Sequence, residues 1–435
     1  MTYAQTLEYL YAQLPMFHRI GPAAFKKDLT NTLALCEHLG NPHRKFLSVH
    51  VGGTNGKGSV SHMLSAICQA SGLKTGLYVS PHYKDFRERI KVDGKYISRA
   101  RVVDFVGKNR EAIERIQPSF FELCVAMAFD HFAREKVDVA IIEVGLGGRL
   151  DSTNVITPEL SVITNISYDH MNMLGDTLPL IAGEKAGIIK PGIPVVIGET
   201  HPESAPVFLT KAESVQAPIV FADQHFKAEE SDSDNMFSTY YTILRDNKPH
   251  LSHLELGAAG PFQAKNLCTV LQAVELLNQT PTFKDHFNES CIRYAFQHLP
   301  RLTRFMGRWQ VIGQNPTVLC DSAHNEGGLT VAFSKIRAML EGSASRLHIV
   351  TGFVNDKDVD KMLALFPADA QYFFAKANIP RGLDTITLQE KAAGFGLKGK
   401  RYSSVKNALK AAKRQASPHD LILVIGSIFV IAEVL

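Results

Sequence analysis

The sequence has no closely paired cysteines, no apolar run long enough to cross a bilayer and no strong excess of either charge. Its six cysteines lie far apart with no CxxC pair, which favours buried free thiols in a reducing cytoplasm. The longest apolar run, Leu421 to Leu435, is too short for a membrane span and contains Gly426, Ser427 and Glu433. Met1 to Leu14 shows no signal-peptide pattern. We therefore expect a soluble cytoplasmic protein with no membrane partner.

Size and charge narrow the functional classes. At 435 residues the chain is long for one core, so two or three domains are expected. Hydrophobic residues make up 45% and charged residues 21%, which is typical of a globular protein. The formal net charge of +4 is too small to favour nucleic acid as a partner and suits anionic small molecules equally well.

The first two thirds of the chain alternate between compact apolar runs and helical patterns. Val60, Met63, Leu64 and Ile67 recur at helical spacing after the first run, and Phe120 to Arg134 is a second, largely apolar helix. Such alternation predicts a doubly wound α/β domain with a mostly parallel sheet. The predicted strands are Phe46 to Val51, Thr75 to Val79, Val137 to Val144, Leu160 to Ile166 and Pro194 to Ile197.

The character of the chain changes between about Ala222 and Leu256, which we interpret as peripheral hairpins and loops with an edge strand at Tyr240 to Leu244. A helix, Asn266 to Leu277, follows. The alternation restarts near Leu299, so we predict a P-loop domain over residues 1–299 and a smaller C-terminal α/β domain over residues 300–435. Its predicted strands and helix are Val318 to Cys320, Leu347 to Val350, Tyr372 to Ala375, Leu421 to Ile425 and Val405 to Arg414.

The strongest chemical signal is the segment from Gly52 to Ser59, which reads Gly-Gly-Thr-Asn-Gly-Lys-Gly-Ser. It follows a predicted strand and opens an amphipathic helix, which is the context of a phosphate-binding loop. Glycines let backbone N–H groups face phosphate oxygens, and a helix N-terminus adds partial positive charge. Lys57 would place an ammonium group on the outer phosphates. The alternative is a glycine-rich turn with a surface lysine, and the strand–loop–helix context argues against it.

This loop departs from the common Walker pattern because Gly58 separates Lys57 from Ser59. In that form it resembles the loop of the Mur ligase superfamily and, within it, of the folylpolyglutamate synthase/dihydrofolate synthase family. Further segments match the signatures of that family in the same order, so the resemblance spans nearly the whole chain. They are Ser80 to His82, Glu88 to Ile90 with Asp93 and Gly94, Glu143 to Asn154, Asp169 and His170 with Leu174 and Gly175, Glu184 to Gly187, Gly307 to Arg308, Asp321 to Asn325, Asp356 to Asp358 and Gly426 to Ser427.

A magnesium site is expected beside the loop, because phosphoryl transfer to a carboxylate brings two anions together. Glu143 ends an apolar strand, at the sheet edge where open α/β sheets bind ligands, and a carboxylate there is costly without a cation. The resemblance assigns Ser80, Glu143 and His170 to Mg²⁺, with His170 also catalytic and K⁺ as an open candidate cation. Taken alone, His170 is as well explained as a capping or core histidine.

Lys185, in Gly-Glu-Lys-Ala-Gly, would on its own be interpreted as a solvated surface lysine. The resemblance implies instead that carbon dioxide carbamoylates it, giving an anion that helps to position magnesium. Carbamoylation requires a neutral amine, which burial favours by lowering the pKa of a lysine. We expect Lys185 to be catalytic for this reason, and Lys57 to be catalytic through its contact with the outer phosphates.

The remaining site residues also follow from the resemblance. Phe262 departs from the family, which usually has His-Gln where this chain has Phe262-Gln263, and His324 is either a cleft residue or a structural one. Arg19 to Phe25 would add a pterin loop of unusual length. The nucleotide residues are Thr54, Asn55, Gly56, Lys57, Gly58, Ser59, Asn266, Arg308 and Asp321, and the pterin or folate residues are Phe121, Glu122, Leu150, Asp151 and Ser152.

The resemblance implies a monomeric ligase that uses ATP to activate a carboxylate as an acyl phosphate and couples it to the amine of L-glutamate. The acceptor is dihydropteroate, a reduced folate or both. One rival is a peptidoglycan-precursor ligase with the same chemistry and a UDP-sugar peptide acceptor. The other is a regulatory module that uses nucleotide only as a switch, which the set of candidate magnesium ligands argues against.

Overall fold

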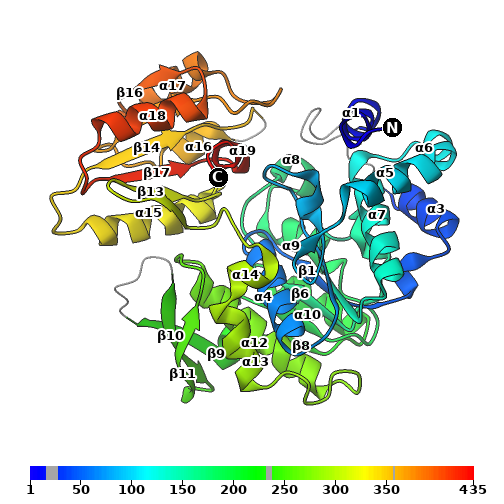
Figure 1. Cartoon of the computed structure of the whole chain (residues 1–435). Coiled ribbons are helices and arrows are strands. Elements are labelled where there is room, and N and C mark those ends of the chain that lie inside the picture. The colour runs from blue at the N-terminus through cyan, green and yellow to red at the C-terminus, as the bar shows by residue number, and fades with distance from the viewer. Residues whose placement is uncertain (16–27, 232–237, 356–357) are drawn as a thin grey trace. The chain divides into compact units, whose positions relative to one another are not determined.

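The structure is a computed structural model of the whole chain, and it describes residues 1–15, 28–231, 238–355 and 358–435. The chain forms two compact units. The larger unit holds most residues up to Phe305, and the smaller one holds Ala258–Phe262 and Met306–Leu435. Figure 1 draws the elements of both units.

A mostly parallel sheet forms the centre of the larger unit. Its order in the described residues is β4-β3-β2-β5-β1-β6-β7-β8. From β2 to β8 in this order, neighbouring strands are parallel, and β3 is antiparallel to both of its neighbours, β2 and β4. All five strands predicted for this region are present, so the predicted α/β class is confirmed. The bounds are β1 Leu47–Gly52, β2 Thr75–Tyr78, β3 Ile90–Val92, β4 Lys95–Tyr96, β5 Val139–Glu143, β6 Leu160–Ile163, β7 Val195–Ile197 and β8 Ile219–Phe221.

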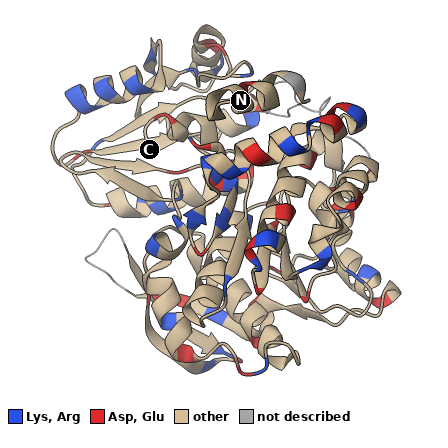
Figure 2. Ribbon diagram, turned by 45° about the vertical axis from the view of Figure 1, so that its right-hand side comes forward, with Lys and Arg blue, Asp and Glu red and all other residues tan. Residues whose placement is uncertain are grey.

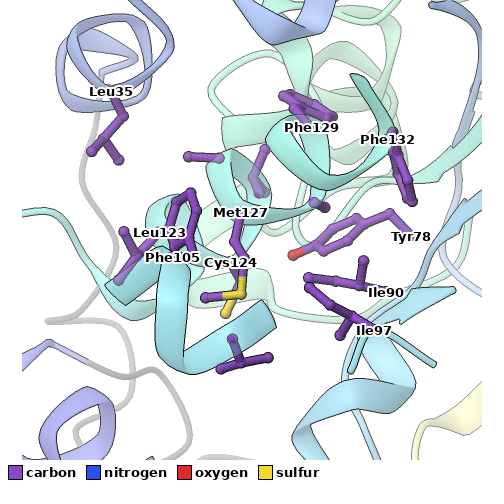
Figure 3. Packing of buried hydrophobic residues seen from close by; sticks show 14 of the residues in the cluster. Leu35, Tyr78, Ile90, Ile97, Phe105, Leu123, Cys124, Met127, Phe129 and Phe132 are labelled. Atoms are coloured by element: carbon purple, nitrogen blue, oxygen red, sulfur yellow. The ribbon is translucent and has the colours of Figure 1, made fainter. Parts of the chain in front are cut away.

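Two helices cover opposite faces of this sheet, as strand alternation requires. On one face, Phe132 of α7 (Phe120–Glu135) packs so tightly on Gly76 of β2 that a Cβ there would lie 2.9 Å from the ring. Figure 3 shows Phe129 and Phe132 of α7 beside Tyr78 in this core. The other face packs against α4 (Lys57–Ala70), which contacts β1, β2 and β5. The sheet is therefore doubly wound, and the helix that follows the phosphate loop lies directly on its central strands.

The region after β8 is a three-stranded antiparallel sheet in the order β11-β10-β9, with bounds β9 Phe226–Ser231, β10 Thr239–Arg245 and β11 Lys248–Leu256. The prediction of an edge strand at Tyr240 to Leu244 is wrong, because this segment is the central strand. Its side chains alternate between buried and half-buried, and helix α12 (Gln263–Gln279) packs against β9. Because only one face of β10 is covered, every second side chain can be polar, so the sequence of β10 resembles that of an edge strand even though β9 and β11 flank it.

Several helices of the larger unit begin at a residue whose side chain caps the first turn. Ser119 caps α7 in a reciprocal capping box with Glu122, and Thr177 caps α9. The bounds are α1 Tyr3–Gln13, α3 Thr30–His38, α5 Arg99–Lys108, α6 Arg110–Ile116, α8 Met171–Leu174, α9 Leu178–Ala186, α10 Ala205–Ser214, α11 Ala222–His225, α13 Glu289–Gln297 and α14 Leu299–Thr303.

The smaller unit has its own sheet, ordered β12-β13-β17-β14-β15-β16, in which β12 is antiparallel and the rest are parallel. Helix α15 contributes Leu329, Phe333 and Ile336 to its core. The bounds are β12 Gln310–Gly313, β13 Thr317–Cys320, β14 Leu347–Thr351, β15 Gln371–Ala375, β16 Gly399–Tyr402, β17 Leu421–Ile425, α15 Glu326–Leu340, α16 Val359–Leu363, α17 Thr385–Gly394, α18 Val405–Gln415 and α19 Ile428–Ala432.

Three expectations about composition can be compared with the fold. All six cysteines are buried and free, as predicted. Leu421 to Leu435 forms a buried strand, a turn and a short helix. No helix in the described part of the chain is both long and apolar enough to cross a membrane. Basic and acidic residues are interspersed along the ribbon (Figure 2), in keeping with the small net charge.

Candidate active site

The loop between β1 and α4 has the strand–loop–helix form that the sequence predicts. Gly53 has φ 133° and Gly56, the N-cap of α4, has φ 82°, a range that L side chains rarely adopt. A Cβ on Gly53 would lie 2.0 Å from Thr164 Oγ1, and one on Gly56 would lie 2.4 Å from Asn266 Oδ1. Glycine is therefore required at both positions by conformation and by space.

The loop is anchored to the segment that follows β6. The backbone N–H of Thr54 donates to the carbonyl oxygen of Asn165 at 2.9 Å, and that of Asn55 donates to Asn165 Oδ1 at 3.1 Å. The side-chain amide of Asn165 in turn donates to the carbonyl oxygen of Asn55. Thr54 Oγ1 donates to Ser167 O and accepts from Ser167 N. These contacts fix the first half of the loop. The first-turn N–H groups of α4, at Lys57, Gly58 and Ser59, have no acceptor within the helix and are the natural phosphate donors.

Two lysines converge on the loop. Lys57 Nζ donates to the carbonyl oxygens of Gly53 and Thr54, each at 3.0 Å. Lys185 Nζ, from α9, donates to the same Gly53 oxygen at 2.8 Å. Lys185 is only 4% exposed, so its interpretation as a surface lysine is wrong. Burial, reinforced by the charge of Lys57, lowers the pKa of Lys185 to about 7, and Asp169 and Asp151 act in the opposite direction.

Glu143 lies between two of the other predicted site segments. It is the last residue of β5 and 5% exposed, and its Oε2 accepts from the backbone N–H of Ser80 at 3.2 Å. Both carboxylate oxygens lie 3.8 to 3.9 Å from the place that a Cβ on Gly58 would take. The structure therefore brings Glu143, Ser80 and the first turn of α4 together at the carboxyl edge of the sheet.

His170 follows the segment that anchors the loop. It adopts a left-handed conformation (φ 50°) as the N-cap of α8, and its backbone N–H donates to Asp169 Oδ1 at 2.8 Å. Its Nε2 lies 3.8 Å from the same oxygen. Within the described residues no group of three or more His, Cys, Asp or Glu side chains is arranged to hold a metal ion. A site with one buried carboxylate, Glu143, suits Mg²⁺, which keeps several waters and takes ligands from substrate phosphates.

Asn266 lies against the loop, as its predicted nucleotide role requires. Its Oδ1 is the atom that crowds Gly56, and its Nδ2 donates to Gln263 Oε1 at 2.9 Å. Phe262, which departs from the family pattern, packs against the apolar cluster of the smaller unit.

Two of the predicted pterin residues, Phe121 and Asp151, meet at the turn that follows β5. A Cβ on Gly145 would lie 2.3 Å from the ring of Phe121 and 3.1 Å from Asp151 Oδ2, so these two side chains meet there. Asp151 is largely committed to the turn, because it accepts from Leu146 N and from the N–H and hydroxyl of Thr153. Burial raises its pKa despite these bonds. Of the two other predicted residues of this turn, Ser152 is buried and Leu150 is half-buried.

Glu122 has two structural partners and one open oxygen. Its Oε2 accepts from Ser119 N at 2.6 Å and from Asn31 Nδ2 at 3.3 Å, while Oε1 has no hydrogen-bond partner among the described residues. An unpaired buried carboxylate oxygen suits a ligand that donates hydrogen bonds. Arg19 to Phe25, the predicted pterin loop, lies outside the described residues.

In the smaller unit, Asp321 follows β13 and is 1% exposed. Its two oxygens accept from Trp309 N and Ala323 N, each at 2.8 Å, and burial raises its pKa while the charge of Arg308 opposes the rise. His324 Nδ1 pairs with Ser322 O at 2.8 Å, which favours its structural interpretation. Asp321 and Arg308 are thus close in this unit, although thirteen positions separate them in the sequence.

Sequence reasoning missed two groups of residues. Thr164 and Asn165 support the loop and could have been suspected from their place after a buried strand. Lys91, His62 and Thr303 form a buried polar chain that no sequence pattern distinguishes from surface positions.

These features define a Mur-type ligase fold. The Mur ligase middle domain family matches residues 51–274, and the Mur ligase glutamate ligase domain matches residues 307–428. The chain is 31% identical to the folylpolyglutamate synthase of Lacticaseibacillus casei, covering 100% of this chain and 98% of that protein. It is 32% identical to the dihydrofolate synthase/folylpolyglutamate synthase of Bacillus subtilis, covering 94% of both.

Solved structures agree. Mycobacterium tuberculosis folylpolyglutamate synthase complexed with ADP and AMPPCP has a TM-score of 0.86 at 30% identity, covering 99% of this chain and 97% of that one. Escherichia coli FolC in complex with DHPP and ADP has a TM-score of 0.84 at 27% identity, covering 100% and 97%. The chain belongs to the folylpolyglutamate synthase/dihydrofolate synthase family, which confirms the resemblance and favours it over a peptidoglycan-precursor ligase.

Proposed function

We propose that this protein uses ATP and Mg²⁺ to add L-glutamate to dihydropteroate, to reduced folates or to both, acting as a cytoplasmic monomer. The observation that carries the proposal is the phosphate loop with Lys57, Lys185 and Glu143 at the carboxyl edge of one sheet. Membership of the family supplies the substrate class.

In the proposed reaction the acceptor carboxylate attacks the γ-phosphate of ATP, giving an acyl phosphate and ADP. The amine of glutamate then attacks the acyl carbon, and phosphate leaves as the amide forms. The first turn of α4 and Lys57 would hold the phosphates and offset their charge. Holding the reactants in one site supplies rate by proximity, and excluding water protects the acyl phosphate from hydrolysis.

Glu143, Ser80 and His170 are the proposed residues for the magnesium ion, whose chemistry when bound is to offset charge on the phosphates. The burial of Glu143 beside Ser80 supports this assignment, because a nearby cation lowers the cost of burying a charged carboxylate. K⁺ remains a candidate second cation.

Lys185 is the proposed carbamoylation site. Its burial and lowered pKa favour the neutral amine that reacts with carbon dioxide.

We assign Asn266, Arg308 and Asp321 to the nucleotide. The pterin is assigned to Phe121, Glu122 and the turn at Leu150, Asp151 and Ser152, where the unpaired Glu122 Oε1 and the ring of Phe121 suit a flat, hydrogen-bonding heterocycle.

The test measures ADP release by the purified protein with ATP, Mg²⁺ and glutamate, giving dihydropteroate and tetrahydrofolate as separate acceptors. Turnover that requires glutamate and one of these acceptors is expected. A UDP-sugar peptide as the sole productive acceptor would overturn the proposal in favour of a peptidoglycan ligase. ADP release that is independent of glutamate and of every acceptor would indicate a nucleotide switch.

A further inference from the structure

Lys91 is a buried lysine with no role in the proposed site. It lies on β3, where it pairs with Leu77 of β2, and it is only 3% exposed. Leu77 in turn pairs with Ile141 of β5, two residues before Glu143. Because alternate residues of a strand share one face, Lys91 and Glu143 lie on the same face of the sheet.

A polar chain holds the Lys91 ammonium group. Lys91 Nζ lies 3.4 Å from His62 Nε2, and His62 Nδ1 lies 2.7 Å from Thr303 Oγ1. The Thr303 hydroxyl donates to the carbonyl of Leu299 at 2.9 Å, so it accepts from His62. His62 is then protonated on Nδ1, and its Nε2 accepts from Lys91. His62 belongs to α4, so the helix that begins at the phosphate loop also fixes this lysine.

Two carboxylates and one arginine face Lys91 from the surrounding elements. Glu88 and Glu143 attract its charge, Arg304 repels it, and burial lowers its pKa to about 7. Glu88 already accepts from the backbone N–H groups of Tyr83, Lys84 and Asp85. Glu88 is the stronger attraction for Lys91, and Glu143 is the weaker one. Glu143 is nevertheless the carboxylate that matters for metal binding, because it lies on the same face of the sheet as Lys91 and is the one assigned to the metal.

We propose that Lys91 is a positioning residue that offsets the charge of Glu143 in the metal-free protein and competes electrostatically with the divalent cation. The proposal rests on the assignment of Glu143 to the metal. The ammonium group of Lys91 and a divalent cation at Glu143 are both positive and repel each other, so Lys91 weakens metal binding. Metal binding then depends on the added negative charge of the nucleotide phosphates. Lys91 thereby favours entry of the metal together with ATP.

The experiment titrates Mn²⁺ into the nucleotide-free protein and follows the free-ion signal by electron paramagnetic resonance. At about pH 6.5, where a group of this pKa is mostly charged, Lys91→Met should lower the Mn²⁺ dissociation constant by at least about threefold. At about pH 8, where wild-type Lys91 is mostly neutral, the difference should shrink. Lys95→Met, on the neighbouring strand β4 and exposed, is the matched control and should change nothing.

Lys91→Gln serves if the methionine variant does not fold, since its amide still donates to His62 without carrying a charge. Unchanged or weaker Mn²⁺ binding by the folded neutral variants at both pH values would overturn the role of Lys91. Glu143→Gln separates this failure from that of the metal site. If it leaves wild-type Mn²⁺ binding intact, the assignment of Glu143 to the metal fails; if it weakens binding while Lys91→Met changes nothing, only the role of Lys91 fails.

Discussion

Lys57 and Lys185 donate to the same atom, the carbonyl oxygen of Gly53, at 3.0 and 2.8 Å. Their ammonium groups therefore lie close together, with Lys185 buried and Lys57 half-buried, and each raises the cost of charging the other. Conversion of Lys185 to a carbamate would replace this repulsion by attraction and would place an anion beside the phosphate loop. The state of Lys185 thus bears on the loop itself as well as on a metal ion.

The first prediction concerns stability and pH. In the folded protein the pKa of Lys185 is about 7, well below its value in an unfolded chain. At any pH between these two pKa values, the unfolded state therefore binds more protons than the folded state. The free energy of unfolding should therefore rise with pH across this window because of Lys185. Lys185→Met should be more stable than wild type at pH 7 in carbon-dioxide-free buffer, and the gap should narrow by about 1.4 kcal/mol per pH unit toward pH 10. Denaturant unfolding at several pH values measures the gap; a constant gap would contradict the lowered pKa.

Lys57→Ala should remove activity and leave the fold intact, because its ammonium group contacts backbone oxygens of the loop and no apolar core. We expect kcat/KM to fall by more than about tenfold, which corresponds to about 1.4 kcal/mol in the barrier. Lys108→Ala, at a lysine side chain that is 66% exposed on α5, is the control. A variant that keeps more than about a tenth of wild-type kcat/KM would show that Lys57 does not act on the phosphates.

Glu143→Gln should abolish magnesium-dependent turnover with little loss of stability. The amide is nearly isosteric and its oxygen can still accept from Ser80 N, but it is a poorer ligand for Mg²⁺. Initial rates across a magnesium titration, with circular dichroism for the fold, measure both effects, and Glu114→Gln on the exposed face of α6 is the control. An unchanged rate and magnesium dependence would make Glu143 a structural residue.

Gly56→Ala tests the packing of the loop. Its φ of 82° and the 2.4 Å approach of Asn266 Oδ1 leave no room for a methyl group. We expect a loss of about 1–3 kcal/mol in stability, together with weakened nucleotide binding. Gly107→Ala is the matched control, because nothing lies within 4 Å of its Cβ position and it sits in helix α5, so it should stabilise by about 0.5–1 kcal/mol. Equal effects of the two substitutions in thermal melts would show that the loop relaxes around the new side chain.

Sequence patterns were most informative where burial is uniform. The central strands β1, β5 and β17 are buried along almost their whole length, so their apolar runs predict them directly. β4 and β16 carry charged residues and lie at sheet edges, and β10 alternates, so none of them produces such a run. The sequence therefore predicts the centres of the two parallel sheets and misses their margins, and it places β10 at an edge although β10 is the central strand of the antiparallel sheet.

The site shows the same division. Glu143 could be placed at a sheet edge because it ends an apolar strand, and the structure puts it beside Ser80. The burial of Lys185 and Lys91 could not be predicted, because a lysine on a helix or on a short strand looks the same in sequence whether it is exposed or buried. Their burial depends on which elements pack over them, which is a property of tertiary contacts between distant segments.

The last prediction is that Lys185 is carbamoylated in the active enzyme. It is 4% exposed, and burial brings its pKa to about 7, so a large share of the amine is neutral near physiological pH and can react with carbon dioxide. The carbamate forms reversibly, so activity should fall in bicarbonate-free buffer and at acidic pH and return when bicarbonate is added.

Lys185→Ala should be inactive, and acetate or propionate should partly restore its rate by supplying a short carboxylate in the space left behind. Lys190→Ala, at a lysine five residues further on that donates to Asn154 O, should show neither the bicarbonate dependence nor the rescue. A crystal structure with nucleotide and magnesium should show an extended side chain at Lys185. A bare ammonium group there, with full activity in carbon-dioxide-free buffer, would refute the modification and leave Lys185 as a second lysine bound to Gly53.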